Sequence, residues 1–116
     1  YDRLGVSYSF GTDSPVVDVN TRNVIYDAVT RTEATTGLPA GGWHVGERIT
    51  AAQALRAYTL GSAHASGRAT DVGTLEAGKL ADIAVLSRDV TACDPEEILS
   101  TEVLRTYVDG RLVFEA

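Results

Sequence analysis

The pattern of apolar and polar positions in the first half of the chain predicts a strand followed by helices. Val6–Phe10 is rich in residues with high β preference and Gly11 directly follows it, so we expect a short strand there. After a turn, Asn20 or Thr21 can cap a helix. The apolar face of this helix repeats at helical spacing and comprises Val24, Ile25, Ala28 and Val29.

The segment "ITAAQALRAYTLG" carries the signals of a second helix. Thr50 and Gln53 have the spacing of a capping box, in which each residue satisfies an end amide of the helix. Gly61 stands where we expect the helix to end. A shorter helical turn is predicted over Ser62–Ala65, and the glycine- and threonine-rich stretch Thr35–Gly46 is predicted to be a loop. The apolar stripe of the helix comprises Ala51, Ala54, Leu55 and Tyr58.

The second half of the chain has the patterns of strands. Within Ala81–Ser87, the residues Ile83–Leu86 are contiguously apolar, which predicts a strand covered on both faces. The tail "VLRTYVDGRLVFE" has two β-prone runs around Asp109 and Gly110. Asp-Gly supplies the positive φ angles of a type I′ turn, so we expect a hairpin.

A short helix is predicted between these strands, in "CDPEEIL". Asp94 is the expected cap, Pro95 takes the first helical position, and Glu97 completes a capping box. Helical patterns give way to strand patterns near residues 69–73. We therefore expect two units, residues 1–70 and residues 71–116.

Composition is that of an ordinary folded domain, with 44% hydrophobic and 22% charged residues among 116. The formal charge of −6 argues against a nucleic-acid or anionic-membrane partner, because both favour a basic face. No apolar run approaches the ~18 residues of a membrane span, and no signal-peptide pattern is present. Cys93 is the only cysteine, which excludes an internal disulfide and a thiolate zinc site and predicts a reducing, cytoplasmic location.

The chain contains no methionine and reaches the expected strand within a few residues of Tyr1. We therefore expect a piece of a longer protein, entered partway through a fold. A lone strand at the start of the chain has unpaired edges. This predicts self-association, disorder of the first residues, or pairing with the missing N-terminal part of the same protein.

The stretch "FGTDSP" places one carboxylate, Asp13, directly after the expected strand. At the C-terminal end of a barrel strand such a residue points into the active-site mouth. There a carboxylate can ligate a metal and can take a proton from an attacking water. Ser14 and Pro15 would shape the turn and aim the carboxylate. The alternative is that Asp13 only caps the turn, as aspartate often does beside serine and proline.

Two histidines are the other candidates for chemistry. His44 lies beside Trp43 in the long loop, where it could line a mouth and contact substrate. His64 is expected to be a partly buried surface residue on the short helical turn. They are on different elements and do not have the spacing of paired metal ligands.

Four segments together resemble the C-terminal end of an amidohydrolase: "GTDSPV", "ERITAAQALRAYTLGSAHASG", "GTLEAGKLADIAVLS" and "TEVLRTYVDGRLVFE". The resemblance is to amidohydrolase family 3, in the branch that includes N-substituted formamide deformylases, and it runs over residues 6–115. The "LEAGKLADIAVL" element is shared across the superfamily. The "ALRAYT" segment and the tail point to family 3.

This resemblance implies an α/β fold, the last part of a metal-dependent (β/α)8 barrel together with part of its small β-sandwich. Val6–Phe10 would be the last barrel strand. Asp13 would approach the metal, which we expect to be zinc, and shuttle a proton from the attacking water to the leaving nitrogen. Ser14 and His44 would contact a small amide-like substrate. From about Asp71 onward the chain would return to the β-sandwich, which is structural in the family.

The family holds its metal mainly with histidines on earlier strands, including a His-x-His pair, and none of these is in the chain. One aspartate does not hold zinc tightly, since usual sites have about three or four ligands. We therefore expect no tightly bound metal and no activity from the isolated chain.

Three classes of function follow. The first is the C-terminal portion of a metal-dependent hydrolase of non-peptide C–N bonds. The second is a non-catalytic binding or assembly domain derived from that fold. The third is a proteolytic fragment without a function of its own.

Overall fold

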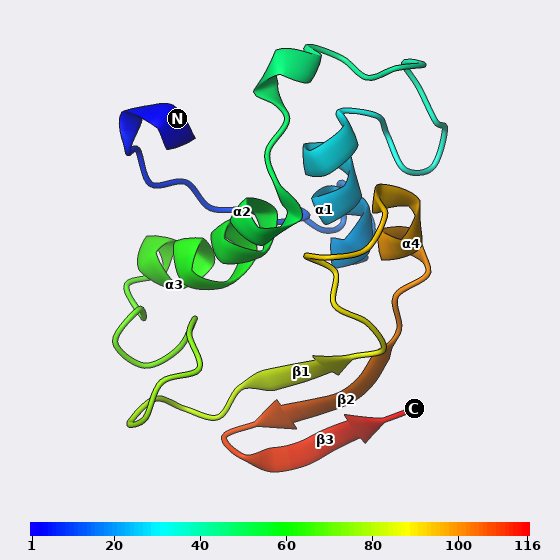
Figure 1. Cartoon of the computed structure of the whole chain (residues 1–116). Coiled ribbons are helices and arrows are strands. Elements are labelled where there is room, and N and C mark those ends of the chain that lie inside the picture. The colour runs from blue at the N-terminus through cyan, green and yellow to red at the C-terminus, as the bar shows by residue number, and fades with distance from the viewer.

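The structure is a computed structural model that describes residues 1–116, with helices gathered on one side and a small sheet on the other (Figure 1). The α-helices are α1 (Thr21–Thr30), α2 (Ala51–Arg56), α3 (Ser62–Ala65) and α4 (Pro95–Leu99). The strands are β1 (Ile83–Leu86), β2 (Val103–Val108) and β3 (Arg111–Glu115). Two 3₁₀ turns cover Asp2–Leu4 and Val45–Glu47, and a π-helix covers Ala57–Gly61. The chain is therefore mixed α/β.

The predicted helix caps are confirmed. The side chain of Asn20 accepts a hydrogen bond from the backbone N–H of Arg22 at the start of α1. At α2, Thr50 and Gln53 form the capping box with both reciprocal hydrogen bonds. The box of α4 is also present, with Pro95 at its first position. These starts were predictable because a cap depends on residues within one turn of the helix.

The predicted strand over Val6–Phe10 is wrong, since this segment is irregular. No strand lies beside it, and the sheet consists of β1, β2 and β3 alone. High β preference favours a strand only where a neighbouring strand accepts its hydrogen bonds. Here the backbone N–H of Phe10 instead donates to the carbonyl of Ala57, 3.3 Å away, on the helical side of the molecule.

The predicted end of the second helix at Gly61 is also wrong. The helical run passes through the π-helix Ala57–Gly61 and continues as α3, which confirms the predicted turn over Ser62–Ala65. Gly61 has helical angles, φ −59° and ψ −47°. Its lack of a side chain serves a close approach: an added Cβ would lie 2.4 Å from the carbonyl oxygen of Tyr8.

The sheet is antiparallel in the order β1-β2-β3, and its hairpin confirms the predicted turn. Asp109 and Gly110 both have positive φ, 50° and 74°. The prediction that the first strand is covered on both faces is wrong, because Ala84 and Val85 are exposed. All five residues of β3 are exposed as well. Nothing in the chain packs over either face of the sheet closely enough to bury these residues.

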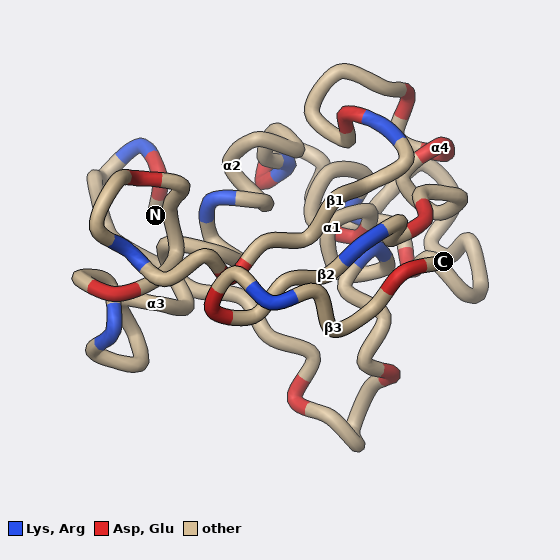
Figure 2. The backbone as a smooth tube through the Cα atoms, turned by 90° about the horizontal axis from the view of Figure 1, so that it is seen from below, with Lys and Arg blue, Asp and Glu red and all other residues tan.

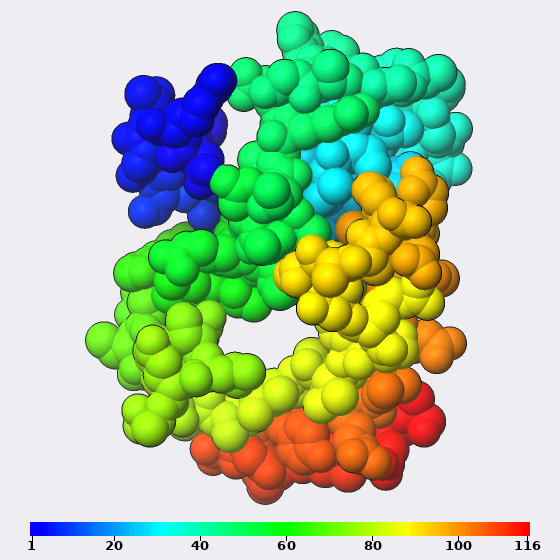
Figure 3. Space-filling model, viewed as in Figure 1, coloured from blue at the N-terminus to red at the C-terminus, as the bar shows by residue number.

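Three helices share one small core. Ile25 of α1, Ala54 of α2 and Ile98 of α4 form a buried cluster. Burying a side chain such as Ile98 contributes roughly 1.5–3 kcal/mol. Only seven of the 116 residues are buried. Figure 3 shows the reason: the background is visible between the N-terminal residues and the segment leading into α2, and again between α3 and β1.

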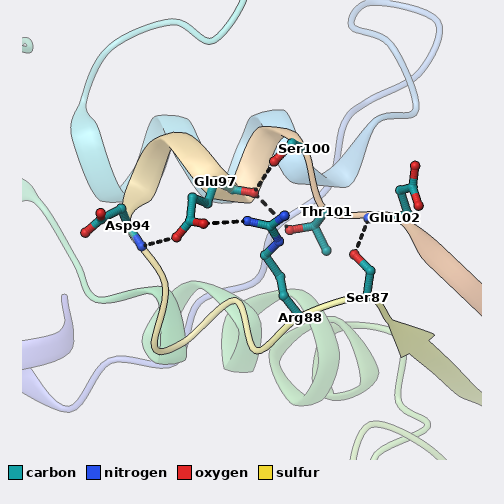
Figure 4. A network of polar contacts seen from close by, with 7 residues as sticks. All are labelled: Ser87, Arg88, Asp94, Glu97, Ser100, Thr101 and Glu102. Atoms are coloured by element: carbon teal, nitrogen blue, oxygen red, sulfur yellow. Dashed lines mark hydrogen bonds and ion pairs between the residues drawn. The ribbon is translucent and has the colours of Figure 1, made fainter.

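A polar network joins α4 to the strands on either side of it (Figure 4). Ser87 and Glu102 exchange two hydrogen bonds, one from the Ser87 backbone N–H to the Glu102 carbonyl and one from the Glu102 N–H to Ser87 Oγ. Thr101 is buried, and its hydroxyl donates to the carbonyl of Glu97. The network therefore connects the end of β1 and the start of β2 to α4.

Charged residues of both signs are interspersed along the chain, and neither sign gathers on one face in the view of Figure 2. The helices are all too short, or not apolar enough, to cross a membrane.

Candidate functional site

Asp13 lies exposed in a tight turn after Phe10. Its φ of 51° is in the left-handed region, which aspartate tolerates better than most residues. The turn is closed by the backbone, because the N–H of Val16 donates to the Asp13 carbonyl oxygen at 2.9 Å. The carboxylate takes no part in this hydrogen bond or in any other that the structure contains. The turn therefore presents the carboxylate outward rather than using it as a cap.

The segment before Asp13 is held by helical residues. The carbonyl of Phe10 accepts a hydrogen bond from Ser62 Oγ at 2.9 Å, and the Phe10 N–H donates to Ala57 O. The Phe10 ring meets the ring of Tyr58 edge-on at 6.4 Å between centroids. It also packs against the helical core cluster. Phe10 is thus held through both its backbone and its side chain, and Asp13 lies three residues after it.

Two phenols beside Phe10 are partly shielded from water. Burial raises the pKa of Tyr58. Burial, together with the negative charge of Asp2, also raises the pKa of Tyr8, whose ring lies 5.7 Å from that of Phe10. Both phenols therefore stay protonated at neutral pH. The aromatic cluster supports the segment by packing and does not supply a base.

His44 is exposed in the long loop, where it has a left-handed φ of 49°. Its ring lies edge-on to the Trp43 ring at 4.4 Å between centroids. Trp43 is itself 61% exposed, but its backbone is held in place, because its backbone N–H donates to the Arg31 carbonyl at 2.8 Å. In return Arg31 Nε donates to the Trp43 carbonyl, and its guanidinium lies 5.2 Å from the ring. The loop presents His44 and Trp43 as one ordered surface.

The loop is closed by a second arginine. Arg48 Nε donates to the Thr30 carbonyl and Arg48 Nη2 donates to the Gly41 carbonyl, both at 2.9 Å. Gly42 has a φ of 90°, and an added Cβ would lie 2.5 Å from the Thr30 carbonyl oxygen. The predicted loop over residues 35–46 is therefore confirmed except for its last two residues, which begin the 3₁₀ turn. It is pinned to α1 at its base.

No hydrogen bond or ion pair joins Asp13 or Ser14 to His44, and all three residues are exposed. His64 is exposed too, where the sequence predicted partial burial. No group of three or more histidine, cysteine or acidic residues has the geometry to hold a metal ion. The residues of this chain therefore do not fit a complete metal site, and Asp13 can supply one ligand or one proton acceptor at most.

Sequence reasoning missed Ser62 and Ala57, which hold the segment before Asp13. A π-helix has no signature in apolar periodicity, so the contact with Phe10 was not visible. One signal was present: Gly61 interrupts a strong helical pattern without ending the helix. A glycine at such a place often marks a close approach of another backbone.

The geometry defines a mixed α/β chain that offers one free carboxylate on a turn fixed against a helical unit. Comparison with known proteins identifies its relatives. The sequence model described as "Amidohydrolase family" matches residues 2–114. The chain belongs to the amidohydrolase family.

Two curated relatives illustrate this membership. The chain is 42% identical over 111 residues to the "N-substituted formamide deformylase" of Arthrobacter pascens, and this alignment covers 96% of the chain and 20% of the relative. It is 34% identical over 109 residues to "Protein LONG AFTER FAR-RED 3" of Arabidopsis thaliana, and this alignment covers 91% of the chain and 18% of the relative. The chain thus spans about a fifth of the length of the curated relatives it matches.

A solved structure shares the fold. The crystal structure of an amidohydrolase from Thermotoga maritima MSB8 superposes with a TM-score of 0.64 over 98% of the chain and 24% of its own length. The sequences are 24% identical. Helices and sheet are therefore arranged as in one part of that larger protein.

Proposed function

We propose that this chain is the C-terminal portion of a metal-dependent hydrolase that cleaves non-peptide C–N bonds of amide- or formamide-like small molecules. The observation that carries the proposal is the family match over residues 2–114. The 42% identity to an N-substituted formamide deformylase supports the formamide-like substrate class. Residues 1–70 would belong to a (β/α)8 barrel, and residues 71–116 would belong to its small β-sandwich.

Asp13 is the residue of this chain that we assign to chemistry. Hydrolysis adds the oxygen of water to the carbonyl carbon and breaks the C–N bond, so one proton must leave the water and one must reach the departing nitrogen. A single carboxylate can do both in turn. Asp13 suits this role because its carboxylate is free while its backbone is held by the turn. Ser14 and His44, both exposed, are assigned to substrate contact.

The metal belongs to the proposal only as a property of the family. The chain's own residues do not form a metal site. We therefore propose that the ligands would be histidines outside this chain and that the metal would be zinc. The same holds for partners. The exposed sheet and the N-terminal segment, which has no neighbouring strand, would be the surfaces on which the rest of the protein packs. We also propose a cytoplasmic location, which the single free cysteine supports.

The test is Asp13→Asn in the complete open reading frame that encodes the chain, assayed with an N-substituted formamide and with a simple amide. Asn has nearly the same size but cannot accept the proton, so we expect turnover to be abolished and the thermal unfolding midpoint to be unchanged. Asp18→Asn is the matched control, because Asp18 is also an exposed carboxylate in the same stretch. Wild-type turnover in Asp13→Asn would overturn the role of Asp13. Absence of turnover in the wild type, with a stable oligomer, would support the non-catalytic alternative.

A further inference from the structure

The run α2–α3 contains one π-helix, Ala57–Gly61, whose geometry redirects the side chain that follows it. The backbone N–H of Ser62 reaches back five residues to the Ala57 carbonyl. Single π turns inside α-helices are rare and occur frequently at functional sites. Here the turn places Ser62 Oγ 3.2 Å from the Ala57 carbonyl oxygen and 2.9 Å from the Phe10 carbonyl oxygen.

Phe10 uses both of its backbone groups on this turn. Its N–H donates to Ala57 O at 3.3 Å, and its carbonyl accepts from Ser62 Oγ. Ser62 and Phe10 are 52 positions apart in the chain. The helix thus takes the two hydrogen bonds that a neighbouring strand would otherwise take.

The contact is also close in space. An added Cβ at Gly61 would lie 2.4 Å from the Tyr8 carbonyl oxygen and 3.3 Å from the Ser9 Cα. Real Cβ atoms do not approach a backbone oxygen so closely, so only glycine lets the segment lie against the helix here. Three independent features, two hydrogen bonds and one glycine contact, therefore hold residues 8–10 at one place.

We infer that Ser62 is a positioning residue for the reaction: it holds the Phe10 carbonyl on the π turn and so fixes where the following turn presents Asp13. This inference rests on the proposed role of Asp13. Three residues span at most about 10 Å of chain, so Asp13 stays within this reach of Phe10. The hydrogen bond from the Val16 N–H to the Asp13 carbonyl closes the turn and restrains Asp13 further. A displacement of about 1 Å in a reacting group can lower a rate about a hundredfold.

The test compares Ser62→Ala with Ser66→Ala, both made in the complete open reading frame. Ser66 is the matched control because it directly follows α3 as its C-cap residue and its hydroxyl donates to the carbonyl of Ala63 in that helix. Amide hydrogen exchange at Phe10 measures opening of the hydrogen bond from the Phe10 N–H to the Ala57 carbonyl. We expect this bond to open more often when Ser62 no longer holds the Phe10 carbonyl. Steady-state kinetics on the same preparations, normalised to folded protein, read the consequence for turnover.

We expect Ser62→Ala to speed exchange at Phe10 by about five- to tenfold, as the loss of one hydrogen bond predicts. We expect kcat to fall about tenfold or more and KM to stay within about twofold. A displaced Asp13 carboxylate slows the chemical step and leaves substrate binding largely unchanged. Ser66→Ala should change neither quantity, and Ser62→Thr, which keeps the hydroxyl, should restore both.

Unchanged exchange at Phe10 in Ser62→Ala would overturn the inference, because the segment would not depend on this hydroxyl. Unchanged kcat in Ser62→Ala, in an enzyme that Asp13→Asn inactivates, would also overturn it and leave the proposed function standing. A role in stability alone would lower the unfolding midpoint without changing kcat. If Asp13→Asn keeps its turnover, the role proposed for Asp13 fails, and the positioning role of Ser62 in the reaction fails with it. The exchange result then decides only whether Ser62 holds the segment.

Discussion

The guanidinium of Arg88 and the carboxylate of Glu97 form an ion pair, with 2.9 Å between Nη1 and Oε1, that joins the end of β1 to α4. The other carboxylate oxygen of Glu97 accepts from the backbone N–H of Asp94 and so closes the capping box of α4. Figure 4 shows both contacts on the one side chain. Glu97 therefore has two separable roles, one as a charge and one as a cap.

We predict that Glu97→Gln destabilises the chain only slightly, by about 0.5 kcal/mol or less, because an amide oxygen can still close the cap and a half-exposed ion pair contributes little. Glu97→Ala removes the cap as well, and we expect a loss of about 1 kcal/mol. Urea denaturation followed by circular dichroism measures both. Equal losses in the two variants would mean that the charge, and not the cap, stabilises α4.

The elements predicted correctly from sequence depend on near neighbours. The cap pairs Thr50–Gln53 and Asp94–Glu97 and the turn at residues 109–110 have their partners within three positions, so local chemistry decides them. The site could be predicted only in part. Asp13 was found as a carboxylate on a turn, and the resemblance named its family, but its surroundings were not predictable.

The incorrect predictions depend on distant partners. Residues 6–10 have the composition of a strand, but no strand lies beside them and a helix takes their hydrogen bonds. The apolar run Ile83–Leu86 indicated burial on both faces, but in this chain nothing covers its exposed residues. Gly61 indicated a helix end but serves a contact with a segment more than fifty residues away. The apolar pattern indicates which secondary structure and burial a segment favours, but it does not indicate which distant segment packs against it.

Gly110 should resist substitution because of its backbone angle rather than its surroundings. Its φ is 74°, and the nearest atom to an added Cβ is the Ala81 Cβ at 3.9 Å, an ordinary contact. We predict that Gly110→Ala destabilises the hairpin by about 1–2 kcal/mol, the cost of a left-handed conformation for a residue with a Cβ. Gly46→Ala is the control, since Gly46 lacks a positive φ and has nothing within 4 Å. A loss as large in Gly46→Ala would indicate a general effect of removing glycine.

Asp27 should make the chain less stable as the pH rises. Burial raises the pKa of its carboxyl, and the negative charge of Glu33 adds to this, although the N–H of Ala34 donates to it at 2.8 Å. A raised pKa means that the folded state binds the proton more tightly than the unfolded state. Stability from this group is therefore full below the ordinary aspartate pKa of about 3.9 and is lost as the pH rises through the raised value.

The matching variant is Asp27→Asn, whose amide oxygen can still accept from Ala34. We expect this variant to be at least as stable as the wild type at neutral pH. As the pH falls toward about 3.9, we expect the stability of the wild type to increase relative to that of the variant. Thermal unfolding across this range measures the difference. A difference that stays constant with pH would show that Asp27 titrates alike in the folded and unfolded chain.

Gly61→Ala sets helix propensity against the close contact with Tyr8. Gly61 has helical backbone angles, so propensity alone favours alanine by about 1 kcal/mol. The new Cβ, however, would lie 2.4 Å from the Tyr8 carbonyl oxygen, and that neighbour is backbone that must shift as a whole. Forcing a side chain into such a contact typically costs about 1–3 kcal/mol. We predict that Gly61→Ala is destabilising in urea denaturation and that it speeds amide exchange at Phe10. A stabilised variant with unchanged exchange would mean that residues 8–10 do not lie against the helix, and the account of how Asp13 is presented would fall with it.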